Sequence, residues 1–284
     1  KGFSTPCKIY KKCYNSDMIY HVNNKNNPKA GLPRRFAPRN DRVAFTLSEV
    51  LITLGIIGVV AALTLPSLIA NYQEKVYISK ARKAYYTLDQ AVKHAIAEYG
   101  PVYNWPVNHE YYGFDGRDEE MTQIILPYID GVIKTCTGDA QWNSKYCFST
   151  SYKTPTGNNA PYWLNKGTLF MLKDGSSYSI NTSVDGRWCV NETTDYANHC
   201  GLITVDTTGP SGPNVAGKDY INFMITKDGV LPVGRKNDRH SQSFEIGCLQ
   251  NFYNCSAWML YNDNMDYLHC PEKIGWDKAN SCKD

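Results

Sequence analysis

The hydrophobic positions follow two different patterns along the first hundred residues. Residues 50–70 read VLITLGIIGVVAALTLPSLIA, which is 21 residues without an ionisable side chain. As a helix this segment spans about 30 Å, the thickness of the hydrocarbon core of a bilayer. The alternative is a buried core helix of a soluble protein, but such helices usually keep a polar face. The segment therefore predicts a membrane-spanning helix.

The helical pattern continues past this segment with an amphipathic period. Apolar residues recur every three or four positions from Tyr77 to Tyr99, and charged residues, Asp89 among them, fall mostly between them. Gly100-Pro101 is a helix stop signal. We predict one helix over residues 46–99, whose second half needs a sheet or a loop to cover its apolar stripe.

The remainder of the chain is rich in turn residues and carries short strand-like runs. The turn signals Lys173-Asp174-Gly175-Ser176 and Lys227-Asp228-Gly229 predict antiparallel hairpins. Residues 119–128 suggest a short helix. The expected fold class is α+β: a long N-terminal transmembrane and amphipathic helix packed on a small antiparallel sheet with disulfide-pinned loops. The predicted strands cover residues 168–172, 177–180, 202–205, 220–225 and 229–232.

Charge is distributed unevenly. Residues 1–44 hold ten of the 30 Lys and Arg residues but two of the 27 Asp and Glu residues, so the rest of the chain is net acidic although the whole carries +3. Nucleic acid is therefore not a predicted partner.

Eight of the ten cysteines lie between positions 136 and 282, without a CxxC pair or zinc-finger spacing. Disulfides in an oxidising compartment are the favoured use, and buried reduced cysteines in a cytosolic protein are the alternative. Eight cysteines allow 105 pairings. Pairing between neighbours in sequence is our expectation: Cys136 with Cys147, Cys189 with Cys200, Cys248 with Cys255 and Cys270 with Cys282.

The cysteines also decide the predicted orientation in the membrane. Four arginines at positions 34, 35, 39 and 42 precede the apolar segment, but Lys75, Lys80, Arg82 and Lys83 follow it, so the count of flanking positive charges is a tie. Oxidised cysteines would place the second half of the chain outside the cytoplasm.

The polar-to-apolar boundary lies at Arg42-Val43-Ala44-Phe45, and a single acid, Glu49, lies just inside it. A carboxylate entering hydrocarbon is costly unless it stays at the interface, is protonated or finds a partner. Glu49 is therefore expected either to lie at the interface or to await a cation from another molecule.

The run Ala44-Phe45-Thr46-Leu47-Ser48-Glu49-Val50, followed by LITLGIIGVVAALTLPSLI, resembles the class III signal of type IV pilins and of type II secretion pseudopilins. The resemblance implies cleavage between Ala44 and Phe45 by a prepilin peptidase, N-methylation of Phe45, and an assembly role for Glu49 and for Pro66. It also implies a pilin-like fold. The expected partners are this peptidase and methyltransferase, other pilin or pseudopilin subunits, and the inner membrane.

This resemblance divides the chain into four parts. Residues 1–44 would be a basic leader, which is removed or lies upstream of the true start. Residues 45–70 would be the transmembrane and polymerisation helix, residues 71–100 its amphipathic continuation, and residues 101–284 an extracytoplasmic globular α+β domain. The expected location is the bacterial inner membrane for the single-pass precursor and a periplasmic or cell-surface filament after assembly.

One loop offers hard oxygen ligands. Asp206, Asn214 and Asp219 lie in a turn-rich stretch of the type that Ca²⁺ prefers, but their spacing matches no EF-hand. Any long turn has a similar composition. Calcium is the one cofactor candidate.

Catalytic motifs such as HExxH, GxSxG, a P-loop or GxGxxG are absent from the sequence, so we do not expect an enzyme. Two functional hypotheses remain. One is a subunit that is cleaved, methylated and assembled into a type IV pilus or a type II secretion pseudopilus. The alternative is a membrane-anchored extracytoplasmic binding module or enzyme that does not form filaments.

Overall fold

The computed structural model describes residues 45–107, 118–136, 147–160, 169–182, 189, 199–238 and 243–283. The chain divides into two units, Lys1–Thr53 and Leu54–Asp284. The first unit contains the start of helix α1 (Leu47–Tyr99), which is 53 residues long. The second contains the remainder of this helix and all strands of the described residues. The single long helix confirms the prediction over residues 46–99 and shifts its start by one residue.

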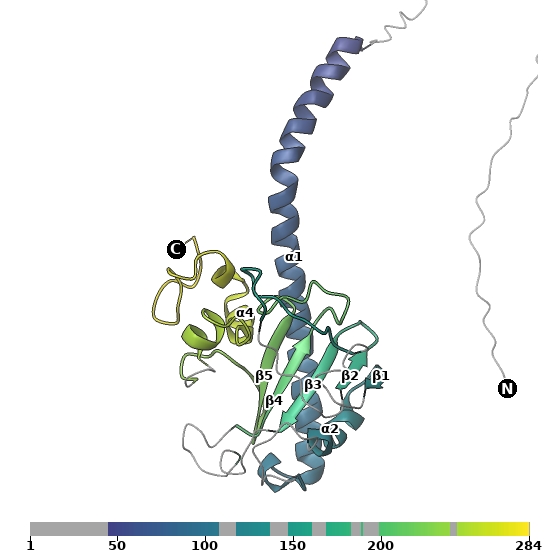
Figure 1. Cartoon of the computed structure of the whole chain (residues 1–284), viewed down its shortest axis with the longest axis vertical. Helices are drawn as coiled ribbons and strands as arrows, with labels where there is room; N and C mark the ends of the chain where they lie inside the picture. Colours follow the sequence, from purple (N-terminus) through teal and green to yellow (C-terminus); the bar gives the residue numbers. More distant parts are fainter. Residues whose placement is uncertain are drawn as a thin grey trace, which may run out of the picture. The chain divides into compact units, whose positions relative to one another are not determined.

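The strands form one antiparallel sheet, in which each strand pairs with its neighbours in sequence (Figure 1). Five of the six strands were predicted, because each is a run of apolar residues bounded by turn residues. The first strand was not predicted, since its three central residues are all exposed and show no alternation. The strands are β1 (Val132–Cys136), β2 (Leu169–Leu172), β3 (Ser177–Thr182), β4 (Gly201–Asp206), β5 (Tyr220–Thr226) and β6 (Gly229–Pro232).

Helix α1 passes behind the sheet in Figure 1 and covers one of its faces. Ala81, Leu88 and Ala91 on the helix are fully buried in the same core cluster as Phe223 of β5. Alanines on this stripe let the helix approach the sheet closely, because they add little volume between the two. The amphipathic period therefore predicted most of the buried face correctly.

Two residues of this half of the helix differ from expectation. Tyr99, placed on the apolar stripe, is exposed, because the helix ends there. Asp89, placed among the polar positions, is buried. Its carboxylate accepts hydrogen bonds from Lys93 Nζ at 2.8 Å and from the backbone nitrogen of Val230 at 3.1 Å. Burial of this charge is tolerated because both carboxylate oxygens have donors.

Short helices complete the second unit. The 3₁₀ helix η1 (Val102–Asn104) follows the stop signal. Helix α2 (Asp118–Ile125) and the 3₁₀ helix η2 (Leu126–Tyr128) occupy the position of the predicted short helix. Residues 243–283, which we call the C-terminal lobe, contain three more: η5 (Phe244–Cys248), α4 (Ser256–Asn262) and η6 (Asp266–Leu268).

The core of the C-terminal lobe is aromatic. The rings of Phe244 and Trp258 stack with centroids 4.3 Å apart, and both side chains are fully buried. Ser256 fastens the lobe to the sheet, because its hydroxyl donates to the backbone oxygen of Asn222 at 2.6 Å and accepts from the backbone nitrogen of Val233 at 2.9 Å. The lobe is thus a fixed part of the second unit.

Four disulfides pin the loops of the second unit, with the pairing expected from the sequence. Each closes a short loop of 7 to 12 residues and is expected to contribute about 2–3 kcal/mol to stability. The last two lie within the C-terminal lobe. The bonds are Cys136–Cys147, Cys189–Cys200, Cys248–Cys255 and Cys270–Cys282.

Candidate functional site

The start of helix α1 is closed by a reciprocal capping interaction between Thr46 and Glu49. Glu49 Oε2 accepts from the backbone nitrogen of Thr46 at 2.8 Å and from its hydroxyl at 2.8 Å. The Thr46 hydroxyl oxygen in turn accepts from the backbone nitrogen of Glu49 at 3.3 Å. This arrangement is a capping box, in which a threonine at the N-cap and a glutamate three residues later satisfy two otherwise unpaired backbone donors.

The capping box gives Glu49 a partner that our sequence analysis missed. The signal was present in the sequence, since Thr46-Leu47-Ser48-Glu49 has the T-x-x-E spacing of this motif directly before an apolar run. The carboxylate therefore does not require another molecule in order to be hydrogen bonded. Both donors of Thr46 bond to Oε2, so this cap leaves the other carboxylate oxygen, Oε1, open to a cation from a second subunit.

Helix α1 exposes its apolar first half. Among the described residues it is the one helix long and apolar enough to cross a membrane by length and composition, and none of its most apolar 18-residue window is buried within the chain. Gly55 and Gly58 have open space where a Cβ atom would lie. Most residues between Phe45 and Ile69 are therefore exposed apolar side chains that lack a protein partner within this chain.

Pro66 lies inside this half without ending the helix. A proline removes one backbone donor and crowds the preceding turn. Nearby hydroxyls bond to backbone oxygens, with Thr64 Oγ1 donating to Val60 at 2.9 Å and Ser67 Oγ donating to Thr64 at 3.0 Å. The assembly role of Pro66 stays a prediction. Phe45 is exposed, and Ala44 lies outside the described residues.

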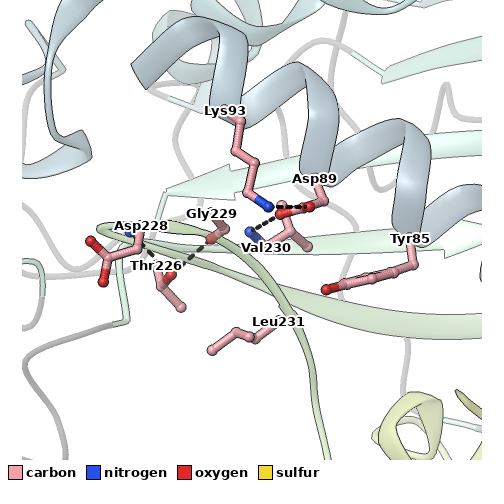
Figure 2. A pocket seen from close by; sticks show the side chains of 8 residues that line it. All are labelled: Tyr85, Asp89, Lys93, Thr226, Asp228, Gly229, Val230 and Leu231. Carbon is pink, nitrogen blue, oxygen red and sulfur yellow. Dashed lines mark hydrogen bonds and ion pairs between the residues drawn. The ribbon is translucent and has the colours of Figure 1, made fainter. Parts of the chain in front are cut away.

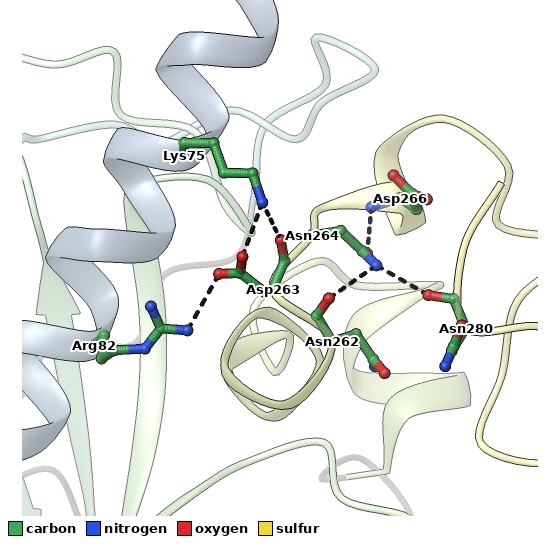
Figure 3. Close-up of polar contacts among 7 residues, drawn as sticks. All are labelled: Lys75, Arg82, Asn262, Asp263, Asn264, Asp266 and Asn280. Carbon is green, nitrogen blue, oxygen red and sulfur yellow. Dashed lines mark hydrogen bonds and ion pairs between the residues drawn. The ribbon is translucent and has the colours of Figure 1, made fainter. Parts of the chain in front are cut away.

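Polar contacts tie the next part of α1 to the C-terminal lobe (Figure 3). Asp263 accepts from Lys75 Nζ at 2.9 Å and from Arg82 at 3.2 Å, and Glu74 lies 2.7 Å from His269 Nε2. The hydrogen bond from Lys75 and the proximity of Arg82 hold the pKa of Asp263 below its usual value. Because both Asp263 pairs are largely exposed, each should add little to stability.

The candidate calcium ligands lie at the base of the loop of residues 206–219. Asp206 and Asp219 are both buried, and the hydroxyl of Thr208 lies 3.2 Å from an oxygen of the first and 2.7 Å from an oxygen of the second. Asp206 also accepts from Tyr152 at 2.5 Å. Asp219 accepts from the backbone nitrogens of Asn214 and Val215, both at 2.7 Å. The two carboxylates therefore organise this loop through protein donors.

Burial and the neighbouring Asp219 raise the pKa of Asp206 to about 7. Two buried carboxylates this close are stable together when a proton or a cation neutralises part of their charge. The side-chain oxygen of Asn214 is buried and has no hydrogen-bond partner, so it could serve as a third hard oxygen. The described residues contain no group of three or more His, Cys, Asp or Glu side chains that could hold a metal ion. Calcium at this loop stays a prediction.

A notch of 270 Å³ lies between α1 and the β5–β6 hairpin (Figure 2). Tyr85 and Leu231 are apolar walls, and the Asp89–Lys93 ion pair lines the helix side. Gly229 is required here, because a Cβ atom at this position would lie 2.8 Å from Asp89 Oδ1. We call this cavity the β6 notch. The remaining residues that line it are Thr226, Asp228, Gly229 and Val230.

Comparison with known proteins gives no relative. No protein-family model matches the chain, and neither a curated protein nor a solved structure does.

Proposed function

We propose that the chain is a prepilin-like structural subunit, cleaved between Ala44 and Phe45, N-methylated, and assembled through its N-terminal helix into a type IV pilus or a type II secretion pseudopilus. The observation that carries this proposal is the division of one continuous helix into an exposed apolar half and a half that is packed on the sheet. An apolar helix surface of this size needs lipid or other helices around it. A filament subunit uses both, lipid before assembly and neighbouring helices after it.

The four cations that follow the apolar segment all have partners later in the chain. Lys75 and Arg82 pair with Asp263, Lys83 pairs with Asp174 at 2.6 Å, and Lys80 donates to the backbone oxygen of Thr207 at 3.1 Å. The positive charges that flank the segment remain equal in number on its two sides, so the proposed orientation rests on the cysteines.

The four disulfides agree with a globular part, residues 101–284, that folds outside the cytoplasm, because structural disulfides are rare in reducing compartments. The proposed location is therefore the bacterial inner membrane for the precursor, with residues 101–284 extracytoplasmic. The fold that we propose is pilin-like: a long helix whose second half lies on an antiparallel sheet.

Processing is the direct test. The full chain should be co-expressed with an active prepilin peptidase and, as a control, with the same peptidase inactivated at its catalytic aspartates. Mass spectrometry of the intact protein and of its N-terminal peptide should find N-methyl-Phe45 in the sample with the active peptidase and not in the control. An intact leader in both samples would count strongly against the proposal and would favour a simple membrane anchor.

A further inference from the structure

The C-terminal lobe meets helix α1 directly after the apolar segment ends. The last residue of that segment is Ala70. Glu74 contacts His269 Nε2 at 2.7 Å, and Lys75 contacts Asp263 at 2.9 Å. At 1.5 Å per residue, Glu74 and Lys75 lie about 6 to 8 Å beyond Ala70 along the helix axis. The lobe therefore begins close to the end of the segment that is long enough to span a bilayer.

This distance matches the polar layer of a membrane. Each headgroup layer is about 5 to 8 Å thick, because a bilayer measures about 40–45 Å in total and about 30 Å across its hydrocarbon core. With Ala70 at the edge of the core, Glu74 and Lys75 lie in this layer or at its outer edge. Tyr72 agrees with this depth, since it is 70% exposed and tyrosine is enriched at membrane–water interfaces.

The lobe lies beside the helix at this level. Asp263 contacts Lys75 and also Arg82, two helical turns further along α1 (Figure 3). The lobe is also fastened to β5, because the hydroxyl of Ser256 donates to the backbone oxygen of Asn222. A lobe held beside a membrane-spanning helix lies over the lipids that surround that helix. In a single inserted copy, the lobe therefore faces the headgroup layer.

The part of the lobe nearest to Glu74 carries exposed amines. The disulfide Cys270–Cys282 begins directly after the histidine that contacts α1. Lys273 and Lys283 lie within three residues of this disulfide, both are exposed, and neither forms an ion pair with another described residue. Glu272 is an exposed acid in the same stretch. Lysine side chains are long enough to reach phosphate groups at a membrane surface while the backbone stays in water.

We propose that in the membrane-inserted precursor the C-terminal lobe lies on the phospholipid headgroups of the leaflet from which α1 emerges, with Lys273 and Lys283 contacting their phosphate groups. This inference rests on the membrane location in the proposed function, but not on filament assembly. The contact limits how deeply the apolar segment sinks into the bilayer, because deeper insertion would push charged groups of the lobe towards hydrocarbon.

Fluorescence quenching tests the contact in the full, uncleaved chain, reconstituted into phosphatidylcholine vesicles that contain phosphatidylglycerol. A coumarin amino acid is introduced at one position at a time, which leaves the cysteines untouched. At position 273 it should lose most of its fluorescence when the lipids carry a nitroxide on the headgroup. The matched control is position 97, because Ala97 is also exposed and lies about 40 Å from Ala70 along the helix axis. Its fluorescence should not change.

Photo-crosslinking tests the lysines in the same vesicles. A p-benzoylphenylalanine at position 272 should form phospholipid adducts that mass spectrometry detects. Lys273→Gln and Lys283→Gln should each lower the adduct yield several-fold, because each removes a donor to phosphate. Lys173→Gln is the control, since Lys173 is exposed in the turn between β2 and β3 and should leave the yield unchanged.

A third coumarin position separates this inference from the proposed function. Val60 is 54% exposed within the apolar segment, and quenching at position 60 by nitroxides on the acyl chains reports insertion of the span. Insertion without quenching at position 273, or lysine variants with unchanged adduct yield, would overturn the lobe contact and leave the membrane location standing. Quenching at position 273 in a chain that the prepilin peptidase does not process would support the lobe contact and count against the proposed function. Absence of quenching at both positions would overturn both.

Discussion

Replacing Glu49 by Gln and by Ala separates two roles of its carboxylate: capping the start of helix α1 and pairing with the amino group of a neighbouring subunit. A glutamine at this position can still accept from the backbone nitrogen of Thr46, so the capping box observed at the helix start is kept. It cannot neutralise an amine. Alanine removes the cap and the charge together. Both variants should insert into the membrane at least as well as the wild-type chain, because each removes an anion from the edge of the apolar segment.

Filament yield is the informative measurement. If the carboxylate of one subunit pairs with the amino group of Phe45 of another, the Gln variant should lose about tenfold in sheared filament yield, since a desolvated charge pair at an interface is worth at least one decade of association. The Ala variant should lose at least as much. Thr46→Ala, which weakens the helix cap by about 1 kcal/mol but leaves the acid, should lose far less.

Ser48→Ala is the matched control, because the side chain of Ser48 contacts the Thr46 hydroxyl at 3.2 Å and neither of the Glu49 oxygens. Circular dichroism of the variants in non-denaturing detergent should show equal helix content for the Gln variant and the wild type. Normal filaments from the Gln variant, together with a deficit in the Ala and Thr46 variants, would refute the pairing argument. Capping would then be the whole role of Glu49.

Three further predictions concern the second unit. The pKa of Asp206 in the folded protein, about 7, lies above the ordinary value of an aspartate. The contribution of Asp206 to stability is therefore complete at acid pH and is lost as pH rises towards and through 7. The thermal midpoint of the wild type should fall over this range, and that of Asp206→Asn should change less. At pH 7.5, the thermal midpoint should be higher with millimolar calcium than in a sample that contains a chelator, and Asp219→Asn should abolish this shift. Equal midpoints with and without calcium would exclude the site. Alkylation without reduction should label few of the eight cysteines after residue 130, and labelling of most would contradict the assigned compartment.

The sequence predicted those parts of the fold that local patterns determine. The long helix, five strands and the hairpin turns each follow from residues close together in the chain. The disulfide pairing was also local, with partners 7 to 12 residues apart. Strand β1 was missed because Lys134 and Thr135 interrupt any alternation, so that only pairing with β2 makes it a strand.

Features that depend on residues far apart in the sequence could not be predicted. Asp89 looks like a solvent-facing residue of an amphipathic helix, and its buried acceptor role needs the backbone of Val230, 141 positions away. The β6 notch has the same origin, since α1 and the last hairpin form it together. For the calcium loop, the sequence offered the right type of oxygen but could not show that protein donors already occupy both carboxylates. The capping box, by contrast, could have been predicted from the T-x-x-E spacing of residues 46–49 but was overlooked.

The capping box changes the energetic argument for assembly. A carboxylate without any partner at the membrane boundary would make the free subunit unstable, and docking of an amine would relieve that cost directly. With Thr46 already donating two hydrogen bonds, part of the cost is removed before any second copy arrives. Docking then adds a cation to a carboxylate that already has donors, so the charge pair can fix the stagger between neighbouring helices while contributing less to net affinity. The driving force of the proposed filament must therefore come mainly from packing along the exposed apolar half of α1 and from contacts between the globular parts that follow residue 100. This is why the Gln variant is expected to assemble poorly and not to fail altogether.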